Sequence, residues 1–257
     1  KCSRRRDSLG GMVEKIKRVA LDEGPSVRFV DCVMRKSARA KRISLRVASL
    51  DKAILTLPKW STWKSGYTFL SQEQEWLKEK TGNYPIIPSL SEYFSKGGEL
   101  WLDRFPRTLD WDRKKDCRKS FYAVEKDVVS VRLSGKTDLE DELLEVCRSL
   151  ARSSLTTRLQ SIGERNDLAW SKVRIGNQRS RWGSCSQSGA ISLNWRLILL
   201  PCELGDYVLC HELAHLKHLN HSVAFWQFLE QIVCGSKALD RRLRGEGKFA
   251  MGLARRD

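Results

Sequence analysis

Short runs of apolar residues occur between residues 27 and 58, where they alternate with polar positions and are separated by basic or turn-forming stretches. Such alternation is typical of β-strands with one buried face. It predicts a meander of strands over residues 27–58. Later strands are predicted at residues 99–102, 108–111, 120–124 and 128–133.

Two segments show the spacing of three or four residues between apolar positions that is typical of helices. The first begins after Ser61, a candidate N-cap, and is closed by Gly82. The second begins at Thr137 or Asp138 and ends near Gly163. Packing on a core explains the apolar face of this long helix fully, so it carries no functional signal of its own.

After the long helix the pattern returns to strands, predicted at residues 172–177 and 190–197 with a turn at residues 186–189. We expect a hairpin that leads to Pro201, where the next helix begins. Ser222 is a candidate N-cap for a further apolar helix. Because the hairpin directly precedes the Pro201 helix, we expect it to form a wall of any cleft built on that helix.

The Pro201 helix carries a cluster of histidines. The chain has four histidines, and all lie between His211 and His221. His211 and His215 are four residues apart, so a helix places them on one face, where both can bind one metal ion. Zinc lowers the pKa of its bound water to about 7, and Glu212 can take the proton of that water. This H-E-x-x-H spacing predicts a metal-dependent hydrolase with Glu212 as general base; an ordinary packing helix is the alternative.

A catalytic zinc usually has three protein ligands. We expect His221 to be the third, because Asn220 tolerates the left-handed conformation that ends helices and the helix can stop near Leu219. On a straight helix, which rises about 1.5 Å per residue, His218 would lie too far from His211 to share its metal ion. Glu230, on the following helix, is a weaker rival for the third ligand.

Composition adds two expectations. The 257 residues are 41% hydrophobic, which suffices for one sizeable core or two small ones. No run approaches the roughly 20 apolar residues of a membrane span and no signal peptide opens the chain, which predicts a cytoplasmic protein without a membrane partner. The eight cysteines are scattered, with no C-x-x-C pair, and are expected to be mostly buried free thiols.

The net charge of +16 predicts attraction to polyanions, including non-specific contact with nucleic acid through a basic surface. A basic, solvated surface without a dedicated partner explains the charge as well. The charge is therefore a hint about partners and does not select a function.

Several segments around the histidines carry a family resemblance. They are Arg181-Trp182-Gly183-Ser184-Cys185, Ile191 to Leu197, Tyr207 to Lys217, Asn220-His221-Ser222 and Phe225-Trp226. In these segments the chain resembles the YgjP-like metallopeptidase-domain family and, more distantly, the SprT-like and WLM zinc proteases. The resemblance extends from about Val33 to about Val233. It implies a metal-dependent hydrolase in which His211, His215 and His221 bind Zn²⁺ and Glu212 is the general base.

The resemblance leaves the substrate open, because members of the family are described both as metallopeptidases and as a UTP pyrophosphatase. Nitrogen ligands favour a peptide or protein substrate over a nucleotide, since magnesium-dependent phosphoanhydride chemistry prefers carboxylate oxygens. A nucleic-acid-binding protein with a structural zinc is a third hypothesis, but it leaves Glu212 without a role. Candidate substrate-binding residues are Arg181, Trp182, Gly183, Ser184, Asn194 and Arg196, which can bind a peptide backbone or phosphates.

Together these patterns predict an α+β protein. We expect a basic tail over residues 1–26, a β-rich region with one helix over residues 27–135, a small zincin-like catalytic core with the H-E-x-x-H helix over residues 136–234, and a basic tail over residues 235–257.

Overall fold

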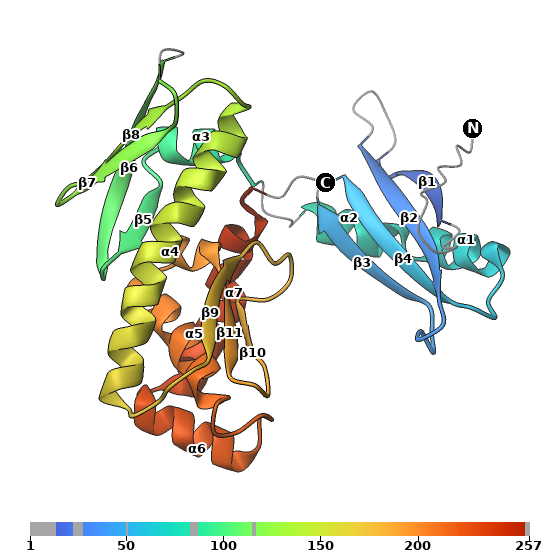
Figure 1. Ribbon diagram of the computed structural model, residues 1–257. Helices are drawn as coiled ribbons and strands as arrows, with labels where there is room; N and C mark the ends of the chain where they lie inside the picture. Colours follow the sequence, from blue (N-terminus) through green and yellow to red (C-terminus); the bar gives the residue numbers. More distant parts are fainter. Residues whose placement is uncertain (1–13, 23–27, 50, 83–86, 115–116, 255–257) are drawn as a thin grey trace. The chain divides into compact units, whose positions relative to one another are not determined.

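The computed structural model describes residues 14–22, 28–49, 51–82, 87–114 and 117–254 (Figure 1). The chain divides into two compact units, residues 1–86 and 87–257, and each has a hydrophobic core of its own. Three sheets and seven α-helices lie in the described residues, so the predicted α+β class is confirmed. The seven cysteines in these residues are free thiols, three of them buried. Most of the tail expected over residues 1–26 lies outside the described residues.

The first unit is a four-stranded sheet with two helices on one face (Figure 1). Its elements are β1 (Glu14–Ala20), β2 (Phe29–Ser37), β3 (Ser44–Ser49), β4 (Lys52–Pro58), α1 (Trp63–Gln72) and α2 (Gln74–Gly82). The strand order is β1-β2-β4-β3, and β2 runs parallel to β4. The predicted meander is therefore wrong in topology, because β3 takes an edge position and leaves β2 to pair with β4.

The helical part of this unit also differs from the prediction. Two helices, which break at Glu73, replace the single one expected. The N-cap is Thr62, whose hydroxyl accepts a hydrogen bond from the Ser65 N–H at 3.1 Å, while Ser61 is buried. The prediction thus located the helical region but neither its cap nor its interruption.

The second unit begins with α3 (Leu90–Ser95) and a sheet of β5 (Glu99–Leu102), β6 (Phe105–Arg113), β7 (Phe121–Val124) and β8 (Val128–Leu133) in the order β5-β6-β8-β7. All four strands were predicted, although β6 is longer than expected. The helix α3 was not predicted. Its N-terminal N–H groups at Leu90 and Ser91 donate to the Glu140 carboxylate, at 2.7 and 3.0 Å.

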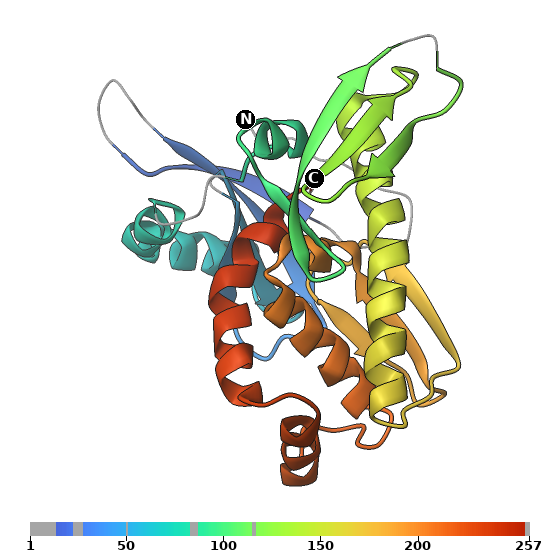
Figure 2. The same cartoon turned by 90° about the vertical axis from the view of Figure 1, so that its left-hand side faces the viewer.

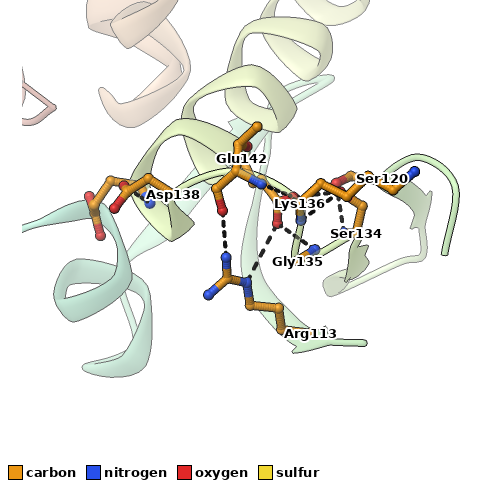
Figure 3. A network of polar contacts seen from close by, with 9 residues as sticks. Arg113, Ser120, Ser134, Gly135, Lys136, Asp138 and Glu142 are labelled. Carbon is orange, nitrogen blue, oxygen red and sulfur yellow. Dashed lines mark hydrogen bonds and ion pairs between the residues drawn. The ribbon is translucent and has the colours of Figure 1, made fainter. Parts of the chain in front are cut away.

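The long helix α4 (Leu139–Arg165) begins as predicted, with Asp138 as its N-cap. Glu142, in its first turn, is 5% exposed and accepts hydrogen bonds from Ser134 and from backbone N–H groups of the preceding turn (Figure 3). These contacts tie α4 to the end of β8 within the second unit. The expected domain boundary at residue 135 therefore lies inside this unit.

A three-stranded sheet follows, with β9 (Lys172–Gly176), β10 (Gly183–Cys185) and β11 (Ala190–Asn194) in the order β10-β11-β9. The two predicted strands do pair, but in parallel, so they do not form the expected hairpin. The hairpin consists of β10 and β11. The second predicted strand ends at Asn194, and residues Trp195–Leu199 form a short 3₁₀ helix.

Three helices complete the second unit: α5 (Cys202–Ala214), α6 (Val223–Ile232) and α7 (Ser236–Gly252). The helix α5 lies between α4 and α7 and packs against both (Figure 2). The segment expected as a basic C-terminal tail thus forms a packed helix, because Leu243 and Ala250 of α7 are buried in the core. Among the described helices, none is both long and apolar enough to cross a membrane.

Candidate metal centre

Three of the four histidines converge at the end of α5. One donor nitrogen from each of His211, His215 and His221 lies within 4.8 Å of the others. The Nε2 atoms of His211 and His221 are 3.0 Å apart. The first two side chains are half-buried and the third is exposed, so the cluster opens toward solvent at His221.

The chain reaches His221 by ending α5 earlier than the sequence suggests. The helix stops at Ala214 with His215 as its C-cap, and the His218 N–H donates back to the Ala214 carbonyl at 3.0 Å. Asn220 has no positive φ, so the left-handed helix end expected there is wrong. His221 follows this turn and directly precedes Ser222, which is the N-cap of α6 as predicted.

His218 has a different part in the cluster. Its backbone carbonyl accepts a hydrogen bond from Nδ1 of His215 at 2.9 Å. Its ring lies against Phe228, with 5.7 Å between the ring centroids. The hydrogen bond to the His218 carbonyl requires the proton of His215 to be on Nδ1, which leaves Nε2 free to act as a ligand.

Phe225 of α6 lies under the cluster, although the sequence predicted no such role for it. Its ring centroid is 5.0 Å from that of His211 and 4.7 Å from those of His215 and His221. The side chain has 0% exposure. It gives the three imidazoles an apolar floor that excludes water from behind.

Glu212, which follows His211 on α5, carries a buried carboxylate. It is 5% exposed, and its Oε2 atom has no hydrogen-bond partner among the described residues. Burial raises its pKa to about 8, and the positive charge of Arg181 opposes this shift. An unpaired buried carboxylate is costly to keep, and such groups concentrate at functional sites.

The absence of a side chain at Gly183 of β10 makes room for the Glu212 carboxylate. A Cβ atom on this glycine would lie 2.5 Å from Glu212 Oε1 and 2.6 Å from its Cγ. The carboxylate therefore lies directly against the backbone of the edge strand. A glycine at this position leaves the space that the carboxylate occupies.

The titration of the histidines suits metal binding. Burial, together with the neighbouring imidazoles of His215 and His221, lowers the pKa of His211 to about 4. Burial also lowers the pKa of His215. Both rings are thus neutral at pH 7, the form that binds metal ions. Three converging imidazoles, with Glu212 next to His211 in the chain, fit an ion such as Zn²⁺, which accepts nitrogen ligands and keeps one position open in catalytic sites.

The candidate substrate-binding residues fall into two groups. Arg181, Trp182, Gly183 and Ser184 lie in or just before β10, alongside Glu212. The ring of Trp182 packs against Gly247 of α7, where a Cβ atom would lie 2.8 Å away. The structure thus brings Gly183 and the charge of Arg181 to the carboxylate, whereas Trp182 packs on α7.

Asn194 and Arg196, in contrast, lie in the interior, with 0% and 2% exposure. The Asn194 amide donates to the backbone carbonyls of Gln178 and Arg181. The Arg196 guanidinium donates to the Leu253 carbonyl at 2.7 Å and to the Asn177 side chain at 2.6 Å. Both side chains hold segments of the chain together, which corrects the expectation that they face a substrate.

Glu230, the rival third ligand, is also engaged elsewhere. Its carboxylate accepts hydrogen bonds from the N–H groups of Gly235 and Ser236, at 2.6 and 2.9 Å. It therefore caps the start of α7.

Comparison with known proteins gives two matches. A family model described as YgjP-like, metallopeptidase domain, matches residues 41–246, which include most of α7. Among solved structures, the chain is similar to the metallopeptidase zymogen abylysin of Pyrococcus abyssi, with 29% identity over 35% of this chain and 91% of that chain and a TM-score of 0.32. No curated protein matches the chain significantly.

Proposed function

The chain belongs to the YgjP-like metallopeptidase-domain family, and from this premise we propose that it is a zinc-dependent peptidase with a zincin-like core. In this proposal His211, His215 and His221 hold the metal and Glu212 is the general base. The observation that carries it is the convergence of the three imidazoles, with the buried carboxylate of Glu212, whose Oε2 atom has no hydrogen-bond partner among the described residues, following His211 on α5.

The proposed chemistry divides between the metal and one side chain. A zinc ion held by three imidazoles supplies a Lewis acid that activates water and polarises a carbonyl group. Glu212 takes a proton from the attacking water and returns it to the nitrogen of the leaving amine. Burial raises the pKa of this carboxyl, which strengthens it as a base for that proton.

The edge strand β10 offers a way to position a polypeptide. It pairs with β11 and ends the sheet order, and Gly183 brings its backbone against Glu212. We propose that an extended substrate adds to the free edge of β10 by backbone hydrogen bonds and so passes the Glu212 carboxylate. A nucleotide substrate fits less well, because Arg196, one of the arginines that would bind its phosphates, is buried.

The proposal is tested with an unfolded polypeptide as substrate. The zinc-loaded chain is expected to cleave it, a chelator to abolish cleavage, and added zinc to restore it. Glu212→Gln is expected to retain zinc and to lose about 10²–10⁴-fold in kcat, the usual contribution of a general base. His221→Ala is expected to lose both activity and bound zinc, whereas the matched variant His218→Ala keeps its zinc.

Two results would overturn the proposal. Full activity of Glu212→Gln would remove the general base. Turnover of nucleoside triphosphates without any cleavage of polypeptide would replace the peptidase by a pyrophosphatase.

A further inference from the structure

A polar contact lies behind His211, on the side away from the other imidazoles. The Nε2 atom of His211 faces His221, whereas its Nδ1 atom lies 3.4 Å from the hydroxyl oxygen of Tyr207. Tyr207 precedes His211 by one turn of α5 and is 2% exposed. Its hydroxyl also lies 3.3 Å from Oδ1 of Asp240, which belongs to α7.

The chemistry of these groups fixes the direction of both hydrogen bonds. An ionised carboxylate only accepts, so the Tyr207 hydroxyl must donate to Asp240. The hydroxyl oxygen is then left as the acceptor for His211, whose Nδ1 must carry a proton. An imidazole protonated at Nδ1 presents the lone pair of Nε2, the atom that faces the cluster.

Asp240 is itself held in place. Its Oδ2 atom lies 2.6 Å from a guanidinium nitrogen of Arg244, one turn later on α7. This ion pair engages one carboxylate oxygen and leaves Oδ1 for Tyr207. His215 is oriented by the backbone carbonyl of His218, in the turn after its own helix, but His211 depends on a side chain from a different helix.

We propose that Asp240 is a positioning residue, which acts through the Tyr207 hydroxyl to hold His211 in the tautomer that binds metal. The inference rests on the proposed function in one respect, the assignment of His211 as a ligand. Partners of ligating histidines usually contribute about 10–100-fold to metal affinity. The helix α7 is thereby part of the site and not an appendage to it.

The first measurement is zinc affinity, determined by competition with a chelating dye. Asp240→Asn and Tyr207→Phe are each expected to weaken zinc binding about 10–100-fold. The double variant is expected to lose no more than either single variant, because the two residues act in series. Glu246→Gln is the matched control: it removes a carboxylate from the same helix that pairs with Arg242, and its zinc affinity should not change.

The second measurement is the tautomer of His211 in the metal-free chain, read from the ¹⁵N chemical shifts of its ring. The native chain should be protonated at Nδ1, and Asp240→Asn should shift the population toward Nε2. Thermal unfolding of the metal-free variants separates this effect from a loss of fold. If Asp240→Asn does not fold, Tyr207→Phe, which keeps the ring, decides the same question.

The outcomes separate the two proposals. Unchanged zinc affinity and an unchanged tautomer in Asp240→Asn would overturn the positioning role while the peptidase proposal stands. Absence of zinc binding by the native chain would overturn the peptidase proposal, and the tautomer measurement would still decide the role of Asp240.

Discussion

A substitution at Gly183 tests whether this glycine sets the position of the Glu212 carboxylate. Gly183→Ala places a methyl group where the Glu212 carboxylate lies, and the carboxylate must move away from the edge strand. We expect peptidase activity to fall at least about 10-fold, with zinc affinity nearly unchanged and a stability loss of about 1 kcal/mol. Activity, zinc affinity and urea denaturation measure the three effects.

Gly245→Ala is the matched control, because a Cβ atom at this α7 position meets nothing within 4 Å. It should keep full activity. Equal activity of the two alanine variants would show that the position of Glu212 does not depend on Gly183.

Residues of the site differ in how well the sequence predicted them. His211, Glu212 and His215, proposed as two ligands and the general base, stand out in the sequence because their spacing matches one face of a helix. Asp240 was missed because nothing in its own segment marks it, and Phe225 was noted only within the resembling segment Phe225-Trp226, which predicts no contact with the histidines. Their roles arise only when α6 and α7 pack against α5, and a single sequence does not state which helices pack together.

The carboxylate of Glu142 stabilises the start of α4 through its hydrogen bonds. Burial by itself raises the pKa of this carboxyl, but hydrogen bonds from Ser134 and three backbone N–H groups outweigh burial and lower it. Because its pKa is lower in the folded chain, the carboxylate stabilises the fold above the ordinary glutamate pKa of about 4.3. That contribution disappears as the pH falls through the lowered value.

Glu142→Gln should therefore reduce the free energy of unfolding by about 2 kcal/mol at pH 7, the usual worth of hydrogen bonds to a charged group. The difference from the native chain should narrow as the pH falls below about 4. Urea denaturation at a series of pH values measures both. Glu145→Gln, which removes an exposed carboxylate of the same helix, should have little effect at any pH. A difference that does not depend on pH would contradict the role of the charge.

Among the helices and strands, the sequence predicted the starts of helices better than their ends and better than the pairing of strands. The caps Asp138 and Ser222 act on N–H groups two or three residues away, so a local pattern reveals them. The end of α5 is set by contacts of His215 and His221 with other groups, which the continuing sequence does not show. The parallel pairing of β9 with β11 joins segments whose own alternation says nothing about their neighbours.

The composition of the chain was compatible with one hydrophobic core or two, but it did not show where the boundary between two compact units lies. The transition at residue 135 looked like a boundary because strands give way to a long helix there. The structure joins the two sides instead, since side chains of β8 and α4 share one core. A change of secondary structure along the chain is therefore a poor guide to where a compact unit ends.

The second unit contains every residue of the proposed metal centre and a core that does not draw on the first unit. A fragment of residues 87–257 is therefore expected to fold cooperatively and to bind zinc with the affinity of the full chain. Thermal unfolding and dye competition measure these two properties, and the fragment carrying His221→Ala serves as the control that lacks a ligand. A fragment that folds but binds zinc more than about 10-fold more weakly would show that the first unit contributes to the metal centre. A fragment that does not fold would show that the two cores depend on each other.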